Sequence, residues 1–155
     1  MKSVYQIAAE SSSLVTWVAA VEVVGLVDLL KSDDYITVFA PNDEAFTKMS
    51  RNTIEDLLGD FEKFADNLRY HIAPGSIMAS ELGRIDSLRT MLRREDLLIS
   101  SRRGLQVNNA RIVEPDIQCR NGVIHVIDSV LTFRKHSKVR AGQFLKSDEW
   151  LIASR

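Results

Sequence analysis

The side chains that could coordinate a metal or act as a nucleophile are few and lie far apart in this sequence. They are three histidines and one cysteine, namely His71, His125, His136 and Cys119. Sites built from imidazole and thiolate ligands usually place two ligands a few residues apart, as in His-x3-His or Cys-x2-Cys. No such spacing occurs in this chain. We therefore predict that it holds no metal.

Motifs that organise an enzymatic site are also missing from the sequence. The seven glycines are scattered, and they form neither a phosphate-binding loop nor a dinucleotide fingerprint, while no serine stands in a Gly-x-Ser-x-Gly elbow. Asp43 and Glu44 do not form a carboxylate pair, because consecutive helical residues point about 100° apart. We predict no catalytic residue and no cofactor.

Length and charge fit one domain and exclude two classes of partner. The chain has 155 residues, 45% of them hydrophobic, and its 20 basic and 21 acidic side chains give a net charge of -1. A chain of about 150 residues can bury most of its surface around one core, and a near-neutral charge offers no cationic field to nucleic acid. The longest apolar stretch, residues 14–30, is interrupted by Glu22 and Asp28 and is too short to span a bilayer. We predict neither nucleic-acid binding nor an integral membrane segment.

The charges are distributed unevenly, and this divides the chain into two parts. Residues 1–133 contain 14 basic and 19 acidic side chains, whereas residues 134–155 contain six and two. In the second part Ser147 can cap a short helix, and the large apolar side chains are Phe144, Leu145, Trp150, Leu151 and Ile152. We predict a domain over 1–133 and a C-terminal extension over 134–155. This extension is expected to dock on the domain or on a partner, which includes self-association.

Helical periodicity is clearest near the N-terminus. Apolar residues recur at helical spacing in Leu14, Trp17, Val18, Val21 and Val24. The hydroxyls of residues 11–13, three consecutive serines, are expected to cap this helix, and Gly25 is expected to end it in the left-handed conformation. Further helices are predicted over 53–58 and 61–70.

A strand, a turn and a helix are expected in close succession between residues 35 and 46. The run Tyr35 to Phe39 is β-branched and aromatic, and the residues that follow it, Ala40-Pro41-Asn42, should break the strand. Asn42 is a good N-cap. The acidic residues 43 and 44 then fall in the first turn, where the helix dipole favours negative charge.

The second half of the chain contains short β-type runs separated by turn residues. The strongest turn signal is Asn121-Gly122, because a type I′ hairpin requires positive φ at both central residues. We predict a hairpin that pairs residues 116–120 with 123–127. His125 alternates with Val123 and Ile127 in its second strand, so we expect a buried histidine rather than a ligand.

Four segments, in this order, resemble motifs of the fasciclin-like domain family. Residues 37–46 (TVFAPNDEAF) resemble its first homology box, and residues 121–128 (NGVIHVID) followed by Val130-Leu131 resemble its second. Between them, residues 68–75 (LRYHIAPG) resemble the central Tyr-His segment, and residues 107–112 (VNNARI) resemble the strand and turn before the second box. The family often has glycine at Asn109, where asparagine is tolerable because it enters the left-handed region more easily than other residues.

The resemblance implies an α+β fold in which helices pack on a twisted β-sandwich or wedge. It also implies a non-catalytic module, secreted or at the cell surface, that mediates adhesion through protein or glycan contacts. No export signal is visible in this chain, so a cytoplasmic location is the alternative. The alternative function is an enzyme or small-ligand carrier acting on a hydrophobic or acidic small molecule. A deep cleft lined by titratable groups would favour that alternative.

The resemblance also suggests two protein-binding segments. The Tyr70-His71 segment is assigned to integrin binding in some animal members of the family, and Glu114-Pro115-Asp116-Ile117 resembles an adhesion tetrapeptide of the same family. Each has a structural alternative. Tyr70 would pack while His71 hydrogen-bonds to backbone in the core, and Pro115 would interrupt a strand at a bulge while Ile117 points inward.

Arginines gather in the turns of the second half. Arg93, Arg94, Arg102 and Arg103 could bind the sulfate or carboxylate groups of an acidic glycan, because guanidinium groups bind such anions with two hydrogen bonds. The alternative is an ordinary solvated surface with acidic neighbours.

Overall fold

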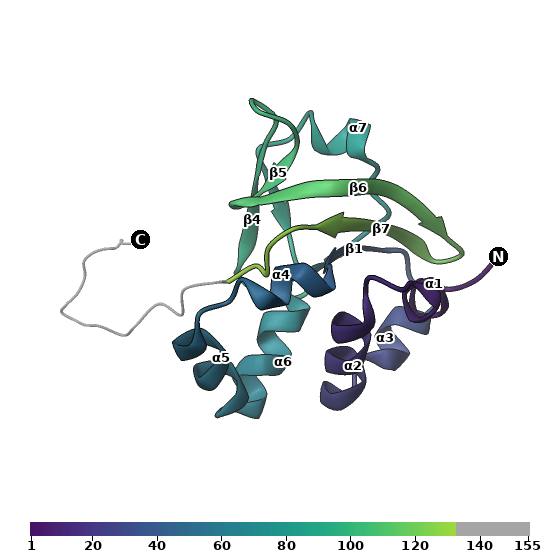
Figure 1. Ribbon diagram of the computed structural model, residues 1–155. Helices are drawn as coiled ribbons and strands as arrows, with labels where there is room; N and C mark the ends of the chain where they lie inside the picture. Colours follow the sequence, from purple (N-terminus) through teal and green to yellow (C-terminus); the bar gives the residue numbers. More distant parts are fainter. Residues whose placement is uncertain (133–155) are drawn as a thin grey trace.

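The computed structural model describes residues 1–132 of the chain (Figure 1). The predicted C-terminal extension, with its docked helix and its self-association, lies outside the described residues. The boundary that we place after residue 133 therefore stays a prediction.

In this part of the chain there are seven helices, and six of them precede residue 70. Their bounds are α1 Val4–Glu10, α2 Val15–Val24, α3 Val27–Lys31, α4 Asp43–Thr47, α5 Arg51–Leu58, α6 Phe61–Arg69 and α7 Ala79–Leu82. Figure 1 shows α1 to α6 on one side of β1, β6 and β7, with α7 on the other side.

The strands form one mixed sheet over the same residues. They are β1 Ile36–Pro41, β2 Ile72–Pro74, β3 Ser87–Arg89, β4 Asp96–Ser100, β5 Gln106–Val107, β6 Ala110–Cys119 and β7 Gly122–Ile127. Their order is β2-β1-β7-β6-β5-β4-β3, with β1 and β7 parallel and all other neighbours antiparallel. After β3, the backbone N–H of Met91 donates to the carbonyl of Ile72 in β2 at 2.7 Å, so the two ends of the sheet approach each other. The predicted α+β fold is confirmed.

The hydrophobic core consists of two clusters, one on each side of the central strands. The first joins the helices to the sheet and includes Trp17 and Leu68, and the second lies within the curl of the sheet and includes Phe39, Leu97 and Ile127. All six residues of β1 and all six of β7 are buried. Because these strands have a core on both faces, they are mostly apolar rather than alternating, and their polar residues Thr37 and His125 are buried as well.

The predicted helix over residues 14–24 forms as α2, and its end is as expected, because Gly25 adopts a left-handed conformation with φ of 79°. Its start differs from the prediction. No serine side chain caps α2. Instead, the Asp43 carboxylate accepts a hydrogen bond from the backbone N–H of Thr16 at 2.7 Å. A residue at the start of α4 thus caps a helix that is distant in sequence.

The strand-to-helix unit forms with a small change of boundary. The strand β1 extends to Pro41, which pairs with Ile127, so the proline stands at the end of the strand rather than beyond it. Proline is tolerated at this last position because the next backbone N–H, that of Asn42, donates to the carbonyl of Ile127 at 3.1 Å. Asn42 caps α4 as predicted, with its side chain accepting from the N–H of Ala45 at 2.8 Å.

The predicted hairpin also forms, but its turn is not the expected one. Cys119 pairs with Gly122, so Arg120 and Asn121 are the turn residues, and neither has positive φ. Gly122 is the first residue of β7, with φ of 154°. A Cβ atom there would lie 1.9 Å from the carbonyl oxygen of Ile36. Glycine is therefore required by the close approach of β1, and the type I′ assignment was wrong.

Candidate functional site

The Tyr70-His71 segment directly follows α6 and leads into β2. His71 is 0% exposed, and its Nε2 accepts from the backbone N–H of Leu131 at 2.9 Å. Since Nε2 is an acceptor, the proton is on Nδ1, which donates to the carbonyl of Asn67 at 2.7 Å. Burial lowers the pKa of His71 to about 4, so the ring is neutral at physiological pH. This is the geometry of the structural alternative, and the binding role of His71 stays a prediction.

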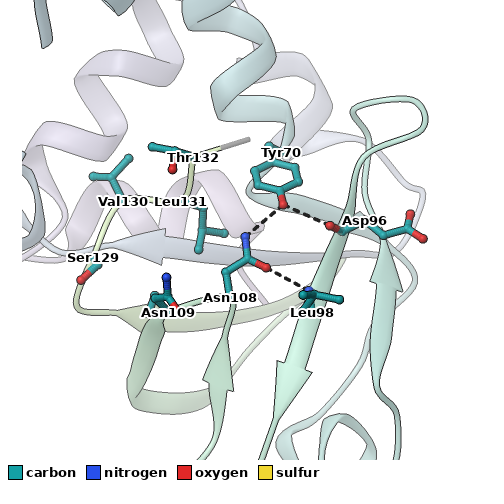
Figure 2. Close-up of a pocket in the computed structure, with 10 residues that line it drawn as sticks. Tyr70, Asp96, Leu98, Asn108, Asn109, Ser129, Val130, Leu131 and Thr132 are labelled. Carbon is teal, nitrogen blue, oxygen red and sulfur yellow. Dashed lines mark hydrogen bonds between the residues drawn. The ribbon is translucent and has the colours of Figure 1, made fainter. Parts of the chain in front are cut away.

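Tyr70 is also largely buried, but its hydroxyl reaches the wall of a pocket of about 530 Å³. The hydroxyl donates to the carbonyl of Asp96 at 3.0 Å and accepts from the side-chain amide of Asn108 at 3.0 Å (Figure 2). Burial is the main cause that raises the pKa of Tyr70, while the hydrogen bond from Asn108 lowers it. The phenol is therefore a neutral, fixed group in this wall.

The pocket opens between the start of β4, the turn after β5 and the segment that follows β7. Its lining residues are Tyr70, Asp96, Leu98, Asn108, Asn109, Ala110, Ser129, Val130, Leu131 and Thr132. Figure 2 shows Asn108 between Tyr70 and Leu98, and the backbone N–H of Leu98 donates to the side-chain Oδ1 of Asn108 at 2.9 Å. Two of these lining side chains are of ionisable type, Tyr70 and Asp96. The pocket thus offers amides, hydroxyls and apolar walls.

Asn108 is a part of this site that we did not predict from the sequence. Its φ is 54°, so the left-handed residue of this turn is Asn108 and not Asn109. The left-handed backbone directs the side chain between β4 and Tyr70, where it makes both hydrogen bonds. The Asn-Asn pair was a visible signal for the turn, but the choice between its members depends on contacts from β4 and α6.

The second predicted segment, residues 114–117, lies at a bulge in β6. The register of β6 against β7 shifts on both sides of Glu114, and Asp116 has a φ of 62°. Glu114, Pro115 and Asp116 are exposed, whereas Ile117 is partly buried against the helix-side core. The predicted bulge at Pro115, with Ile117 pointing inward, is therefore present, and the exposed carboxylates leave the binding role of this segment open.

His125 fixes the backbone of this bulge. Its Nδ1 accepts from the N–H of Asp116 at 3.1 Å, so the protonated Nε2 donates to the carbonyl of Ile77 at 2.8 Å. The ring is fully buried and stacks on Phe39, and burial is the main cause that lowers its pKa. The Asp116 carboxylate accepts from the N–H of Ala79 at 2.8 Å. The bulge is thus held to the start of α7, as expected for a buried, satisfied histidine.

The four predicted arginines lie in two pairs, one at each end of β4. Arg93 and Arg94 lie in the turn before β4, and Arg102 and Arg103 lie in the turn after it. Five residues of extended strand separate the two turns, which is about 17 Å. All four side chains are at least partly exposed. The two pairs therefore lie at opposite ends of β4, and a single glycan site would need to span that distance.

Residues 1–132 contain no group of three or more His, Cys, Asp or Glu side chains that could hold a metal ion. Cys119 is buried, and burial raises the pKa of its thiol to about 11, so it is not a thiolate at neutral pH. In the same part of the chain, no helix has both the length and the apolar character needed to cross a bilayer.

The described residues form an α+β module in which His71 and His125 hold backbone segments in place. Exposed side chains lie at the β6 bulge and polar groups line the pocket beside Tyr70. The family model of the fasciclin domain matches residues 12–133, and this chain belongs to that family. The recognition made from the four sequence segments is therefore confirmed.

Relatives and a solved structure agree with this assignment. The uncharacterized protein sll1735 of Synechocystis sp. is 36% identical over 131 residues, which cover 84% of this chain and 98% of that protein. The cell surface glycolipoprotein MPB83 of Mycobacterium bovis is 38% identical over 109 residues, covering 70% of this chain and 48% of that protein. A structure of a FAS1 domain pair from the insect cell adhesion molecule Fasciclin I has a TM-score of 0.70 at 18% identity. It covers 85% of this chain, which spans about half (51%) of that structure.

Proposed function

We propose that this chain is a non-catalytic adhesion or interaction module, secreted or at the cell surface, that binds a protein or glycan partner. Family membership supports the proposal. So do the names of two similar proteins, one a cell surface glycolipoprotein and the other a cell adhesion molecule. The cytoplasmic location is the alternative to this proposal.

The observation that carries the proposal is the bulge of β6. It presents exposed Glu114 and Asp116 side chains on a backbone that is fixed by His125 and by Ala79. A surface that is already ordered loses less conformational entropy on binding than a mobile loop does. We place the protein contact at Glu114 and Asp116, with Ile117 anchoring the strand beneath them. Tyr70 and His71 enter the proposal as residues that support the pocket, since Tyr70 lines it and His71 is fully buried and bonded to Leu131.

For an acidic glycan, the proposed contacts are the two arginine pairs at the ends of β4. Their exposure supports this, because exposed guanidinium groups are available for bidentate hydrogen bonds. A sulfated chain longer than about 17 Å could reach both pairs.

The proposal is tested with the full chain immobilised on a sensor surface. The probes are a display library of extracellular proteins and a glycan array that includes sulfated chains. We expect a protein partner whose binding is lost in Glu114→Lys but retained in Asp34→Lys. Both substitutions reverse one exposed carboxylate, so the second controls for net charge. Equal loss in both variants would contradict a specific contact at the bulge.

A small-ligand carrier remains the second candidate, because the pocket beside Tyr70 has a volume of about 530 Å³. Native mass spectrometry of the chain isolated from its source should then show a bound molecule. Leu98→Trp, which places a large ring at the pocket wall, should release it. A chain without bound mass that retains partner binding would reject the carrier in favour of the module.

A further inference from the structure

An exposed apolar surface lies on the hairpin formed by α5 and α6, which are side by side in Figure 1. It consists of Ile54, Leu58 and Phe61, whose side chains are 36%, 67% and 58% exposed. Ile54 and Leu58 are four residues apart on α5 and so share one face. Phe61 begins α6 directly after the turn Gly59-Asp60. We refer to these three residues as the α5–α6 patch.

Carboxylates surround the patch and are not all neutralised. Residues 51–69 contain five acidic side chains, Asp60 among them, and three basic ones. The three basic side chains form ion pairs within the hairpin, Arg51 with Glu55, Lys63 with Asp56 and Arg69 with Asp66. Asp60 and Glu62, on either side of Phe61, form no ion pair with any described residue, and both are exposed. The patch therefore combines apolar side chains with unbalanced negative charge.

Residues 133–155 of the same chain have the complementary character. Residues 134–155 contain six basic and two acidic side chains, against 14 basic and 19 acidic in residues 1–133. They also contain five large apolar side chains, Phe144, Leu145, Trp150, Leu151 and Ile152. Opposite charges on two surfaces favour their encounter, and apolar burial supplies the larger part of the binding free energy.

The structure also determines where this segment leaves the domain. The Leu131 carbonyl accepts from the side-chain amide of Asn67 at 2.8 Å, and its N–H donates to His71. The chain is thus fixed to the C-terminal half of α6, the helix that begins at Phe61. Phe61 is six residues from Asn67, about 9 Å along the helix axis. Eleven residues of chain from 133 to 144 can span up to about 36 Å, so the apolar residues can reach the patch.

We propose that residues 133–155 dock on the α5–α6 patch of their own domain. Their apolar side chains cover Ile54, Leu58 and Phe61, and their basic side chains face Asp60 and Glu62. The proposal does not depend on the adhesion function, because it concerns a surface away from the β6 bulge. Its consequence is that the chain covers this apolar surface itself and leaves the bulge available for a partner.

Hydrogen–deuterium exchange of the full chain, followed by mass spectrometry, tests the proposal. We expect peptides from residues 140–155 to exchange at least about tenfold more slowly than the same sequence as a free synthetic peptide, since docking protects backbone amides. In Leu58→Ser and in Phe61→Ser this protection should be lost. Val23→Ser is the matched control, because Val23 on α2 is 66% exposed, close to the 67% of Leu58, and lies outside the patch. Unchanged exchange in β7 of every variant shows that the domain remains folded.

Three outcomes would overturn the proposal. Exchange of residues 140–155 at the free-peptide rate in the unmodified chain would mean that the segment does not dock. Protection that survives both Leu58→Ser and Phe61→Ser would place the segment elsewhere. Protection that depends on protein concentration, with a doubled mass in light scattering, would make a second copy the occupant. Glu62→Lys gives an independent check, since it should speed the exchange of residues 140–155 and the effect should shrink in about 1 M salt, where charges are screened beyond about 3 Å.

Discussion

Replacing Gly122 tests the central contact of the sheet, where the hairpin turn meets β1. In Gly122→Ala the new Cβ would lie 1.9 Å from the oxygen, 2.9 Å from the carbonyl carbon and 3.1 Å from the nitrogen of Ile36. These are backbone atoms at the start of β1, a central strand of the sheet, so no flexible side chain can move aside. The N–H of Ile36 also donates to the carbonyl of Asn121 at 3.0 Å. Relief of the clash must therefore separate β1 from β7.

The expected magnitude has two parts. A non-glycine residue at a positive φ costs about 1–2 kcal/mol, and a forced backbone shift in a packed core typically costs about 1–3 kcal/mol more. We expect Gly122→Ala to lower the free energy of unfolding by about 2–5 kcal/mol, a large fraction of the roughly 5–15 kcal/mol of a typical domain. Gly104→Ala is the control, because Gly104 also has a positive φ of 80° but a Cβ atom added to it would meet nothing within 4 Å.

Urea denaturation measures both variants. The midpoint of Gly122→Ala should fall well below that of Gly104→Ala, with the same dependence on urea concentration. If the two variants lose equal stability, the positive φ is the whole cost and the close approach to Ile36 is not real. If Gly122→Ala matches the unmodified chain, the position of the hairpin itself is wrong.

Three further perturbations follow from hydrogen bonds that join segments distant in the sequence. Burial lowers the pKa of His71 to about 4, below its usual 6.5, so the unfolded state binds more protons between these values. Stability that is present above pH 6.5 should fall by about 3 kcal/mol as the pH drops to 4, and urea titrations at several pH values should show a smaller loss in His71→Gln. Asn121→Ala removes the acceptor of the Val4 N–H and the donor to the carbonyls of Leu30 and Ser32. It should cost about 2–4 kcal/mol in the same assay, whereas Arg120→Ala in the same turn should cost much less. Asp43→Ala removes the cap of α2 and should lower the free energy of unfolding by about 1 kcal/mol. Thermal unfolding measures this loss, and Glu44→Ala is the control, whose loss of stability should be near zero.

The local sequence pattern was sufficient to predict the elements whose apolar residues lie close together in the chain. The helical spacing through Trp17 and Val21 predicted α2, and the β-branched run before Asn42 predicted β1. Both signals arise from residues that are neighbours in the sequence. The short helix α1 was not predicted. Its burial of only Val4 and Ala8 leaves too little periodicity in seven residues to separate a helix from a mixed run.

Features that depend on contacts between distant segments could not be read from local pattern. The cap of α2 comes from Asp43, whose carboxylate accepts from the N–H of Thr16. The two residues are 27 positions apart in the sequence. The need for glycine at residue 122 comes from Ile36 in a different strand. The arginine pairs were close in sequence but fall at opposite ends of β4, because five residues of extended strand lie between the turns. In each case the deciding contact is set by the topology of the sheet.

The placement of the two histidines shows how such contacts bear on function. The rings of His71 and His125 each join backbone from two other segments, Asn67 with Leu131 in one case and Ile77 with Asp116 in the other. A ring with both nitrogens committed in this way cannot bind a partner without giving up a buried hydrogen bond, which typically costs about 1–3 kcal/mol. Substituting either histidine should therefore lower stability and disturb binding indirectly, by releasing the β6 bulge or the segment after β7. The Glu114 side chain is exposed at the bulge, so its loss should reduce partner binding without a change in stability. That separation distinguishes a contact residue from a residue that only holds the surface in place.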